Sequence, residues 1–339
     1  RQWIEEGEVV GIFPEGQTSF SGVSHPIPEA TAKLLRFLKV PVVALRNEGG
    51  YFARPRWSRR RRCSHKGSGS GVPSPGISLH YELLFNQEQI RQAKLSEITR
   101  NIQDFLHYDP YEPERTVFPL LDRGLKRQNL AESMELVFYV CLSCRNINSL
   151  GTMRSEGMNL HCSACGGAWQ ISDDSRFLQY SNHSCHSCHS CHSCHSWPAS
   201  KQSPQAYSGP KCYNLEQYYQ RQLVLLQEWA EAGKLRIQKE FFRLRCYDET
   251  PTGADFAYRQ GQLELDSEGL KLRQKGTILH HFRIDQIFAS HVFKFNTWEF
   301  HAGAGSKKTQ LFVLEWPKKT DSAFLLLDSL RALQKHNKG

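Results

Sequence analysis

Four cysteines in two closely spaced pairs are the residues of this 339-residue chain whose spacing points most directly to chemistry. Each pair has the form Cys-x2-Cys, and the four residues are Cys141, Cys144, Cys162 and Cys165. The 17 residues between the pairs fit a zinc ribbon, in which two such turns place four thiolates around one tetrahedral zinc ion. Four thiolates fill every coordination position, so we expect a structural zinc ion with no open position for catalysis.

Further cysteines lie in a low-complexity repeat. The triplet Cys-His-Ser recurs within residues 184–196, and residues 182–211 have the biased composition of a linker without a packed core. Such a tract could bind soft metal ions. A repeat expansion or a reading-frame artefact is the simpler interpretation, so we expect any metal ion bound there to be adventitious.

The charge and hydropathy of the chain restrict its partners. It has 43 Lys and Arg against 34 Asp and Glu, and the net charge of +9 favours nucleic acid or an anionic membrane surface. A basic run at residues 54–62, beside Trp57, could be a solvated loop or a contact to an anionic membrane interface. No stretch of 18 or more apolar residues is present, so we expect a cytoplasmic protein.

The N-terminal third alternates strand-like and helix-like segments. Residues 9–13 and 40–46 are short β-branched runs, and residues 28–39 between them have apolar residues at helical spacing. The order strand, helix, strand predicts an α/β unit with a parallel sheet. A further strand is expected at residues 77–85, and two short helices are expected within residues 87–107.

The C-terminal third has a different pattern. Residues 241–316 contain many short alternating runs broken by turn residues, which predicts an antiparallel β module. Residues 321–336 then form one amphipathic helix with apolar residues at every third position. A small curved sheet closed by one helix resembles the pleckstrin-homology (PH) architecture.

A turn motif after the first predicted strand carries a family resemblance. GIFPEGQTSFSG at residues 11–22 and VPVVAL at residues 40–45 resemble, in order and spacing, two sequence blocks of the glycerophospholipid acyltransferases. The best-known members of that family acylate lysophosphatidic acid. GGYFARPRW at residues 49–57 is similar to a bacterial branch that carries a zinc ribbon and a β-rich tail. By itself, Phe-Pro-Glu-Gly would also fit an ordinary turn.

The resemblance implies a fold and a reaction. The fold would be a partial α/β acyltransferase core, a small zinc ribbon, and a β-rich PH-like module with a C-terminal helix. The reaction would transfer a fatty acyl group from acyl-CoA or acyl carrier protein to a lysophospholipid such as 1-acylglycerol-3-phosphate, in phospholipid biosynthesis at the inner face of the membrane. The expected parts are the core at 1–119, the ribbon at 131–181, a linker at 182–211, a helix at 212–236 and the β-rich module at 238–339.

The resemblance also implies a substrate-binding turn. The Glu of the first block helps to organise the glycerol-phosphate site in the family, a role that we assign to Glu15. Gly16 lets the backbone approach a phosphate closely. The family usually has Arg at the position of Thr18, so we expect the positive charge to come from other side chains. These are Arg46, Arg54 and Arg56.

The catalytic residues of the family are a His and an Asp five positions later, which act as general base and orienting group. They should precede Phe13, where this chain has no histidine. We therefore expect an N-terminally truncated member that contains no catalytic residue and is inactive alone. His280 and Asp285 have this spacing, but they follow the motif and lie in the predicted β module, so we interpret them as a chance match.

Two other functions are compatible with the sequence. The charge and the paired cysteines would fit a zinc-ribbon protein that binds nucleic acid. The ribbon lacks interleaved basic and aromatic residues, so nucleic acid is not the favoured partner. The third hypothesis is a non-catalytic protein that binds lipid through the C-terminal module.

Overall fold

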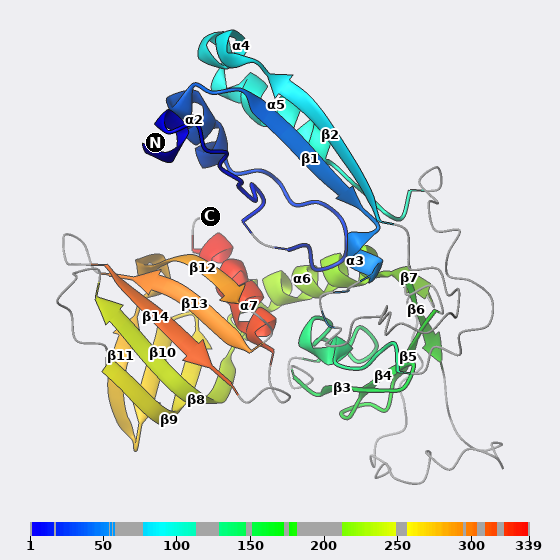
Figure 1. Ribbon diagram of the computed structural model, residues 1–339. Coiled ribbons are helices and arrows are strands. Elements are labelled where there is room, and N and C mark those ends of the chain that lie inside the picture. The colour runs from blue at the N-terminus through cyan, green and yellow to red at the C-terminus, as the bar shows by residue number, and fades with distance from the viewer. Residues whose placement is uncertain are drawn as a thin grey trace, which may run out of the picture. The chain divides into compact units, whose positions relative to one another are not determined.

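The structure is a computed structural model, and it describes residues 2–16, 18–53, 55, 57, 77–112, 129–146, 151–172, 176–181, 212–248, 256–293, 296–303, 309–316 and 322–337. It divides into two compact units, Arg1–Lys126 and Arg127–Gly339. The described residues form three sheets, of two, five and seven strands, and every strand pairing in them is antiparallel (Figure 1).

The first unit is a two-stranded sheet with helices packed on it. Its elements are α1 (Gln2–Glu5), α2 (Glu29–Leu38), β1 (Val42–Glu48), α3 (Gly50–Ala53), β2 (Ser78–Phe85), α4 (Gln87–Gln92) and α5 (Leu95–Leu106). The buried core side chains are Ile27, Ala32, Leu35, Phe85, Ile90, Ala93, Ile98 and Ile102. Ile98 and Ile102 are four residues apart and therefore lie on one face of α5, which contacts both α2 and β1.

The prediction of a parallel α/β acyltransferase core is wrong. β1 and β2 run antiparallel, with Leu45 opposite Tyr81, and residues 9–13 form no strand. The strand propensity of a β-branched run reflects packing against neighbours. Val9 and Phe13 are 95% and 93% exposed and gain little from such packing. The helix predicted at residues 28–39 is present as α2.

The second unit begins with a five-stranded sheet and a long helix, which we call the ribbon part. Its elements are η2 (Met134–Leu136), β3 (Met153–Glu156), β4 (Asn159–Cys162), β5 (Ala168–Ile171), β6 (Phe177–Ser181), β7 (Cys212–Asn214) and α6 (Leu215–Glu231). The strands lie side by side in chain order. Asn214 and Gln217 form a reciprocal capping box that starts α6. Trp169 of β5 packs edge-to-face against Tyr218 of α6, which holds the helix on the sheet.

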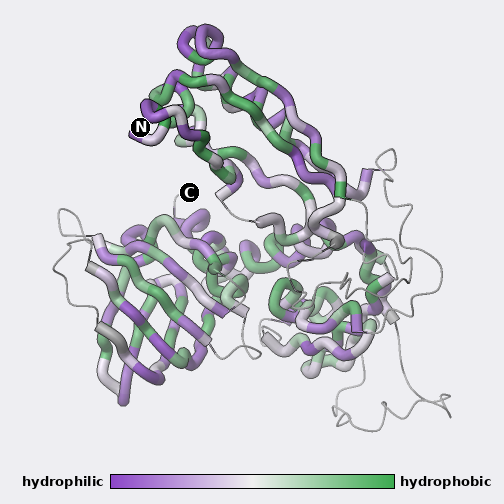
Figure 2. Tube along the Cα trace, in the orientation of Figure 1, coloured by the Kyte–Doolittle hydropathy of each residue, from purple (hydrophilic) through white to green (hydrophobic). Residues whose placement is uncertain are grey.

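The rest of the second unit is a seven-stranded antiparallel sheet with one helix packed on it. Its strands follow the spatial order β11 (Thr277–Phe282), β10 (Gly269–Gln274), β9 (Phe256–Asp266), β8 (Ile237–Asp248), β14 (Gln310–Glu315), β13 (Thr297–Ala302) and β12 (Ile287–Phe293), with η5 (Ile284–Gln286) before β12 and α7 (Ala323–His336) after β14. Hydrophobic and hydrophilic residues alternate along these strands (Figure 2). In β9, for example, Leu263 and Leu265 are buried, whereas Gln262 is exposed.

Helix α7 is buried on more sides than its sequence predicted. The predicted apolar face is buried and consists of Phe324, Leu327, Leu330 and Leu333. Asp328 and Ser329 lie off this face, yet they are only 2% and 0% exposed. The reason is that α7 contacts β12 and β13 of the seven-stranded sheet and also η2 and α6 of the ribbon part. The helix is therefore an internal element of the second unit.

Candidate metal centre

The four cysteines that the sequence singled out come together in the ribbon part. Their Sγ atoms all lie within 4.8 Å of one another, and those of Cys141 and Cys165 are 3.7 Å apart. A tetrahedral site with metal–sulfur bonds of about 2.3 Å has sulfur–sulfur edges of about 3.8 Å. The cluster is therefore compatible with a metal site of four thiolates.

Both cysteine pairs lie in turns of the same shape. The backbone N–H of Arg145 donates to the carbonyl of Cys141 at 3.2 Å, and that of Gly166 donates to the carbonyl of Cys162 at 2.9 Å. Arg145 and Gly166 have φ angles of 47° and 72°, in the left-handed region that glycine adopts most easily. Each turn folds its pair of cysteines back toward the centre, which explains how two short segments supply four ligands.

Hydrogen bonds around the sulfur atoms favour thiolates at part of the cluster. A hydrogen bond from Cys141 lowers the pKa of Cys144 to about 6. Hydrogen bonds from the neighbouring cysteines, Cys141 first among them, also lower the pKa of Cys162. In addition, the backbone N–H of Gly167 donates to the Sγ of Cys165 at 3.4 Å. The same network raises the pKa of Cys141 and of Cys165, so the four sulfur atoms share their protons. Metal ions bind the thiolate form, so metal binding would displace the protons that remain.

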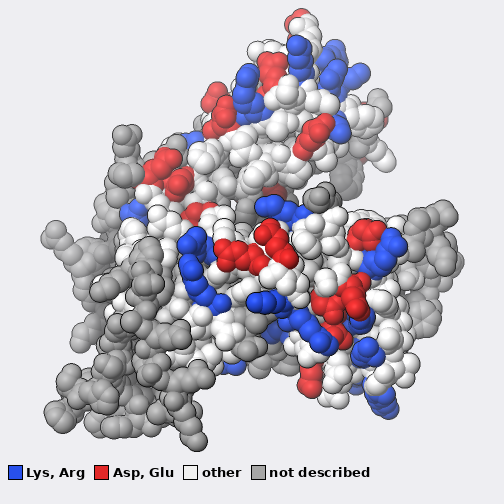
Figure 3. All heavy atoms as spheres, turned by 180° about the vertical axis from the view of Figure 1, so that it is seen from behind, with Lys and Arg blue, Asp and Glu red and all other residues white. Residues whose placement is uncertain are grey.

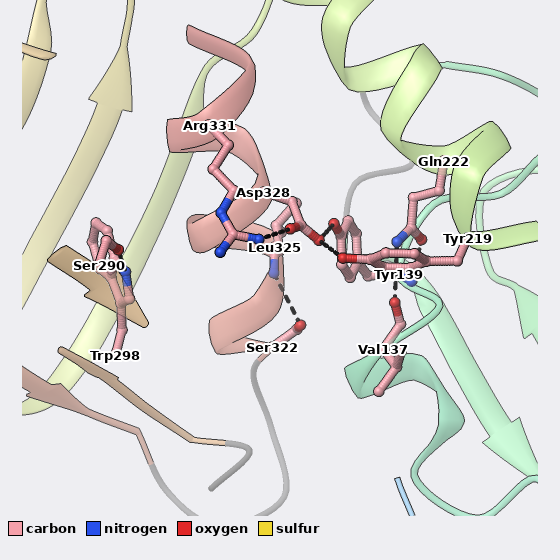
Figure 4. Close-up of polar contacts among 10 residues, drawn as sticks. All are labelled: Val137, Tyr139, Tyr219, Gln222, Ser290, Trp298, Ser322, Leu325, Asp328 and Arg331. Atoms are coloured by element: carbon pink, nitrogen blue, oxygen red, sulfur yellow. Dashed lines mark hydrogen bonds and ion pairs between the residues drawn. The ribbon is translucent and has the colours of Figure 1, made fainter. Parts of the chain in front are cut away.

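A buried glutamine holds the chain segment that leads to the first cysteine pair. The Oε1 atom of Gln222 accepts hydrogen bonds from the backbone N–H groups of Tyr139 at 2.9 Å and Val140 at 3.1 Å. Its Nε2 atom donates to the carbonyl of Val137 at 3.1 Å (Figure 4). Tyr218, one turn earlier in α6, donates from its hydroxyl to the carbonyl of Val140 at 2.9 Å. Helix α6 thus positions Cys141 through its backbone.

Gln222 was not among the residues predicted to form the site, although the sequence of α6 contains a signal for it. The buried residues of this helix follow the spacing of one face and are Leu215, Tyr218, Tyr219, Gln222, Leu225, Leu226, Trp229 and Ala230. Gln222 is a polar amide within this otherwise apolar and aromatic face. Such a residue is buried only when its hydrogen bonds are satisfied, so its position on the face indicates a structural partner.

The predicted substrate-binding turn is ordered around Glu15. The Glu15 carboxylate accepts a hydrogen bond of 2.7 Å from the backbone N–H of His25, and burial raises its pKa although this bond opposes the change. Gly16 has a φ angle of +73°, and Thr18 is exposed. Ser19 accepts from the N–H of Gly22 at 2.7 Å. These contacts give the loop a defined shape.

Three arginines were predicted to supply the positive charge at this turn, and only one of them is among the described residues. Arg46 is half-buried, pairs with Glu48 at 2.8 Å and donates to the carbonyl of Phe105 at 2.8 Å, so its guanidinium already has protein partners. Arg54 and Arg56 lie outside the described residues, as do Arg59 to Arg62 and the Cys-His-Ser repeat. Their predicted roles stay predictions.

His280 and Asp285, which share the spacing of the family's catalytic pair, have different partners. The imidazole of His280 stacks on Phe282 and lies 3.8 Å from the Sγ of Cys246, and burial lowers its pKa. Asp285 is exposed and forms an ion pair of 2.7 Å with Arg283. His280 is half-buried beside aromatic side chains of the β module, and Asp285 lies on the surface of that module.

The described surface shows charges of both signs. On the face in Figure 3, Lys and Arg side chains are interspersed with Asp and Glu side chains. Among the described residues in this view, neither sign of charge forms a continuous patch. Among the helices of the described residues, none is both long and apolar enough to cross a membrane.

Comparison with known proteins finds similarity at the level of structure alone. No family profile matches the chain, and no curated protein matches its sequence. The C-terminal phosphotyrosine interaction domain of mouse APBB2 aligns with 31% of this chain and 90% of its own, at 12% identity and a TM-score of 0.23. A complex of the FERM and C-terminal domains of Drosophila Merlin aligns with 37% of this chain and 36% of its own, at 13% identity and a TM-score of 0.20.

Proposed function

We propose that the chain is a zinc-binding protein in which Cys141, Cys144, Cys162 and Cys165 hold one structural zinc ion. The observation that carries this proposal is the cluster of four Sγ atoms within 4.8 Å. Four thiolates complete a tetrahedral coordination shell, so the ion would stabilise the ribbon part without binding a substrate. Tetrahedral thiolate sites also suit iron, so both metals need to be measured.

Elemental analysis of the purified full chain tests this proposal. The four cysteines of the repeat, at positions 185, 188, 191 and 194, are first replaced by serine so that they cannot contribute metal. We expect about one zinc per chain in this protein and close to none in the double variant that carries both Cys141→Ser and Cys162→Ser. The matched control is Cys212→Ser, because Cys212 is exposed and lies outside the cluster. Equal zinc content in all three proteins would refute the site.

As a second candidate, we propose that the turn around Glu15 takes part in acyl transfer from acyl-CoA or acyl carrier protein to a lysophospholipid at the inner, cytoplasmic face of an anionic membrane. This is what the resemblance to the glycerophospholipid acyltransferases implies. The observation that favours it is the ordered loop, in which the Glu15 carboxylate holds the His25 N–H at 2.7 Å. The Arg46 guanidinium is already paired with Glu48, so Thr18, Arg54 and Arg56 are the other side chains proposed to contact the phosphate.

Equilibrium binding of lysophosphatidic acid tests the second candidate. Glu15 acts by positioning the loop, so Glu15→Ala removes a charge-assisted hydrogen bond and is expected to weaken binding about 10-fold. Glu8→Ala is the control, since Glu8 is an exposed carboxylate in the same unit. Equal affinity of the two variants would remove the support that the loop gives to this function.

A further inference from the structure

Asp328 of α7 forms a buried contact with the ribbon part. Its side chain is 1% exposed. Its Oδ2 atom accepts a hydrogen bond of 2.6 Å from the hydroxyl of Tyr139 and another of 2.8 Å from the hydroxyl of Tyr219 (Figure 4). Arg331, on the same helix, places a guanidinium nitrogen 3.9 Å from Oδ1. One carboxylate thus joins α7 to both the metal-binding segment and α6.

Tyr139 connects this contact to the metal centre. It precedes Cys141 by two residues, and every residue from 137 to 141 is at most 1% exposed. Gln222 fixes the backbone of this segment through the N–H groups of Tyr139 and Val140. Protein interiors are close-packed, so a displacement at Cys141 is transmitted to the neighbouring residues. A change in the position of the first cysteine pair can therefore alter the hydrogen bond from the Tyr139 hydroxyl to Asp328 of α7.

Both ends of α7 have polar contacts as well. At the start of the helix, the Ser322 hydroxyl donates to the carbonyl of Leu136 at 2.5 Å and accepts from the N–H of Leu325 at 3.2 Å. Near its end, Gln334 donates to the carbonyl of Ile287 at 2.7 Å. One end is thus held by η2 of the ribbon part and the other by β12 of the seven-stranded sheet.

We propose that metal binding at the four cysteines stabilises the docking of α7, with Asp328 as the coupling residue. This inference rests on the proposed zinc site. Without the ion, the first cysteine pair loses its constraint, Tyr139 shifts, and the buried carboxylate loses a hydrogen bond that it needs in an apolar environment. By linkage, docked α7 raises the affinity for the metal ion by the same factor. Because α7 contacts both the seven-stranded sheet and the ribbon part, the attachment of these two parts then depends on whether the metal ion is bound.

Hydrogen exchange of the full chain, with bound zinc and after chelation, tests the direction from metal to helix. We expect amides in the buried part of α7, residues 324–333, to exchange about 10-fold faster after chelation. Amides of α5, in the first unit, serve as the internal control and are expected to keep their rates. Unchanged α7 exchange in a protein shown to lose one zinc would overturn the coupling and leave the metal site standing. Absence of bound zinc before chelation would refute both.

Competition for zinc with a chromogenic chelator tests the reverse direction. We expect Asp328→Ala and Tyr219→Phe each to weaken zinc binding about 10-fold, although neither residue is a ligand. Tyr219→Phe preserves the ring, which guards against a result caused by misfolding. Tyr258→Phe is the matched control in the seven-stranded sheet. Unchanged zinc affinity in both test variants, or an equal loss in the control, would overturn the assignment of Asp328.

Discussion

The hydroxyl of Tyr139 donates a hydrogen bond of 2.6 Å to the carboxylate of Asp328, which lies 189 residues later in the chain. Burial raises the pKa of Asp328, whereas the hydrogen bonds from Tyr139 and Tyr219 act in the opposite direction. Burial and the nearby carboxylate also raise the pKa of Tyr139 well above its ordinary value. The two groups therefore depend on each other for a hydrogen bond, because both side chains are buried.

Replacement of Asp328 by alanine is expected to lower the free energy of unfolding of the second unit by about 2–4 kcal/mol. The reason is that two buried tyrosine hydroxyls lose their acceptor, and an unsatisfied buried polar group costs about 1–3 kcal/mol. Urea unfolding of zinc-loaded protein measures the loss. Asp285→Ala is the control, since Asp285 is exposed and its replacement is expected to change stability by less than about 0.5 kcal/mol. A loss as small as that of the control would contradict the buried network.

Replacement of Gln222 by methionine is expected to destabilise the second unit by about 3 kcal/mol. Methionine fills a similar volume but leaves two backbone N–H groups and one carbonyl near Cys141 without partners. Gln220→Met on the exposed side of the same helix is the matched control. If thermal unfolding shows equal stability for the two variants, the glutamine does not hold the metal-binding segment.

Two adjacent glycines of the second cysteine pair are expected to differ in their response to substitution. Gly166 has a φ angle of +72° and open space around it. Gly166→Ala is therefore expected to lower the free energy of unfolding by about 1–2 kcal/mol through backbone strain alone. Gly166→Asn is expected to lower it less, because asparagine adopts this conformation more easily. A Cβ atom at Gly167 would lie 3.3 Å from the Sγ of Cys165, so Gly167→Ala is expected to weaken zinc affinity as well. Parallel zinc titration and urea unfolding separate these effects. Equal zinc affinity for Gly166→Ala and Gly167→Ala would contradict the distinction.

The stability of the first unit is expected to fall as the pH rises above 4.5, the ordinary pKa of Glu15. Burial raises the pKa of Glu15 in the folded state, so the folded protein binds this proton more tightly than the unfolded chain does. The stabilisation is therefore complete below pH 4.5 and is lost as the pH passes through the raised pKa. Urea unfolding followed at backbone amide NMR signals of α5 measures this slope. Glu15→Gln is expected to flatten this slope, and Glu8→Gln is expected to leave it unchanged. A slope that persists in Glu15→Gln would show that another group causes the pH dependence.

Local patterns in the sequence were sufficient to predict the residues of the metal centre. Each Cys-x2-Cys pair lies within one turn, so the spacing alone places Cys141 near Cys144 and Cys162 near Cys165. The helices α2 and α7 and the antiparallel strands of residues 241–316 were predictable for the same reason, because periodicity reports which face of a short element is apolar. The zinc itself stays a prediction.

Contacts between distant segments could not be predicted in this way. The parallel core was wrong because strand-like residues at 9–13 do not specify a partner, and the partner of β1 is the later, antiparallel β2. Asp328 lies off the apolar face of α7, so the periodicity of the helix does not indicate that it is buried. Its burial depends on Tyr139 and Tyr219, which are 189 and 109 residues away.

Zinc K-edge X-ray absorption of the full chain, with the repeat cysteines replaced by serine, identifies the ligands of the proposed four-cysteine site. We expect one coordination shell of four sulfur atoms at about 2.3 Å, with no nitrogen or oxygen ligand. Cys212→Ser is expected to leave the spectrum unchanged, and Cys165→Ser is expected to remove one sulfur atom from the shell. A shell with nitrogen or oxygen atoms at about 2.0–2.1 Å in the unsubstituted cluster would contradict the four-thiolate site.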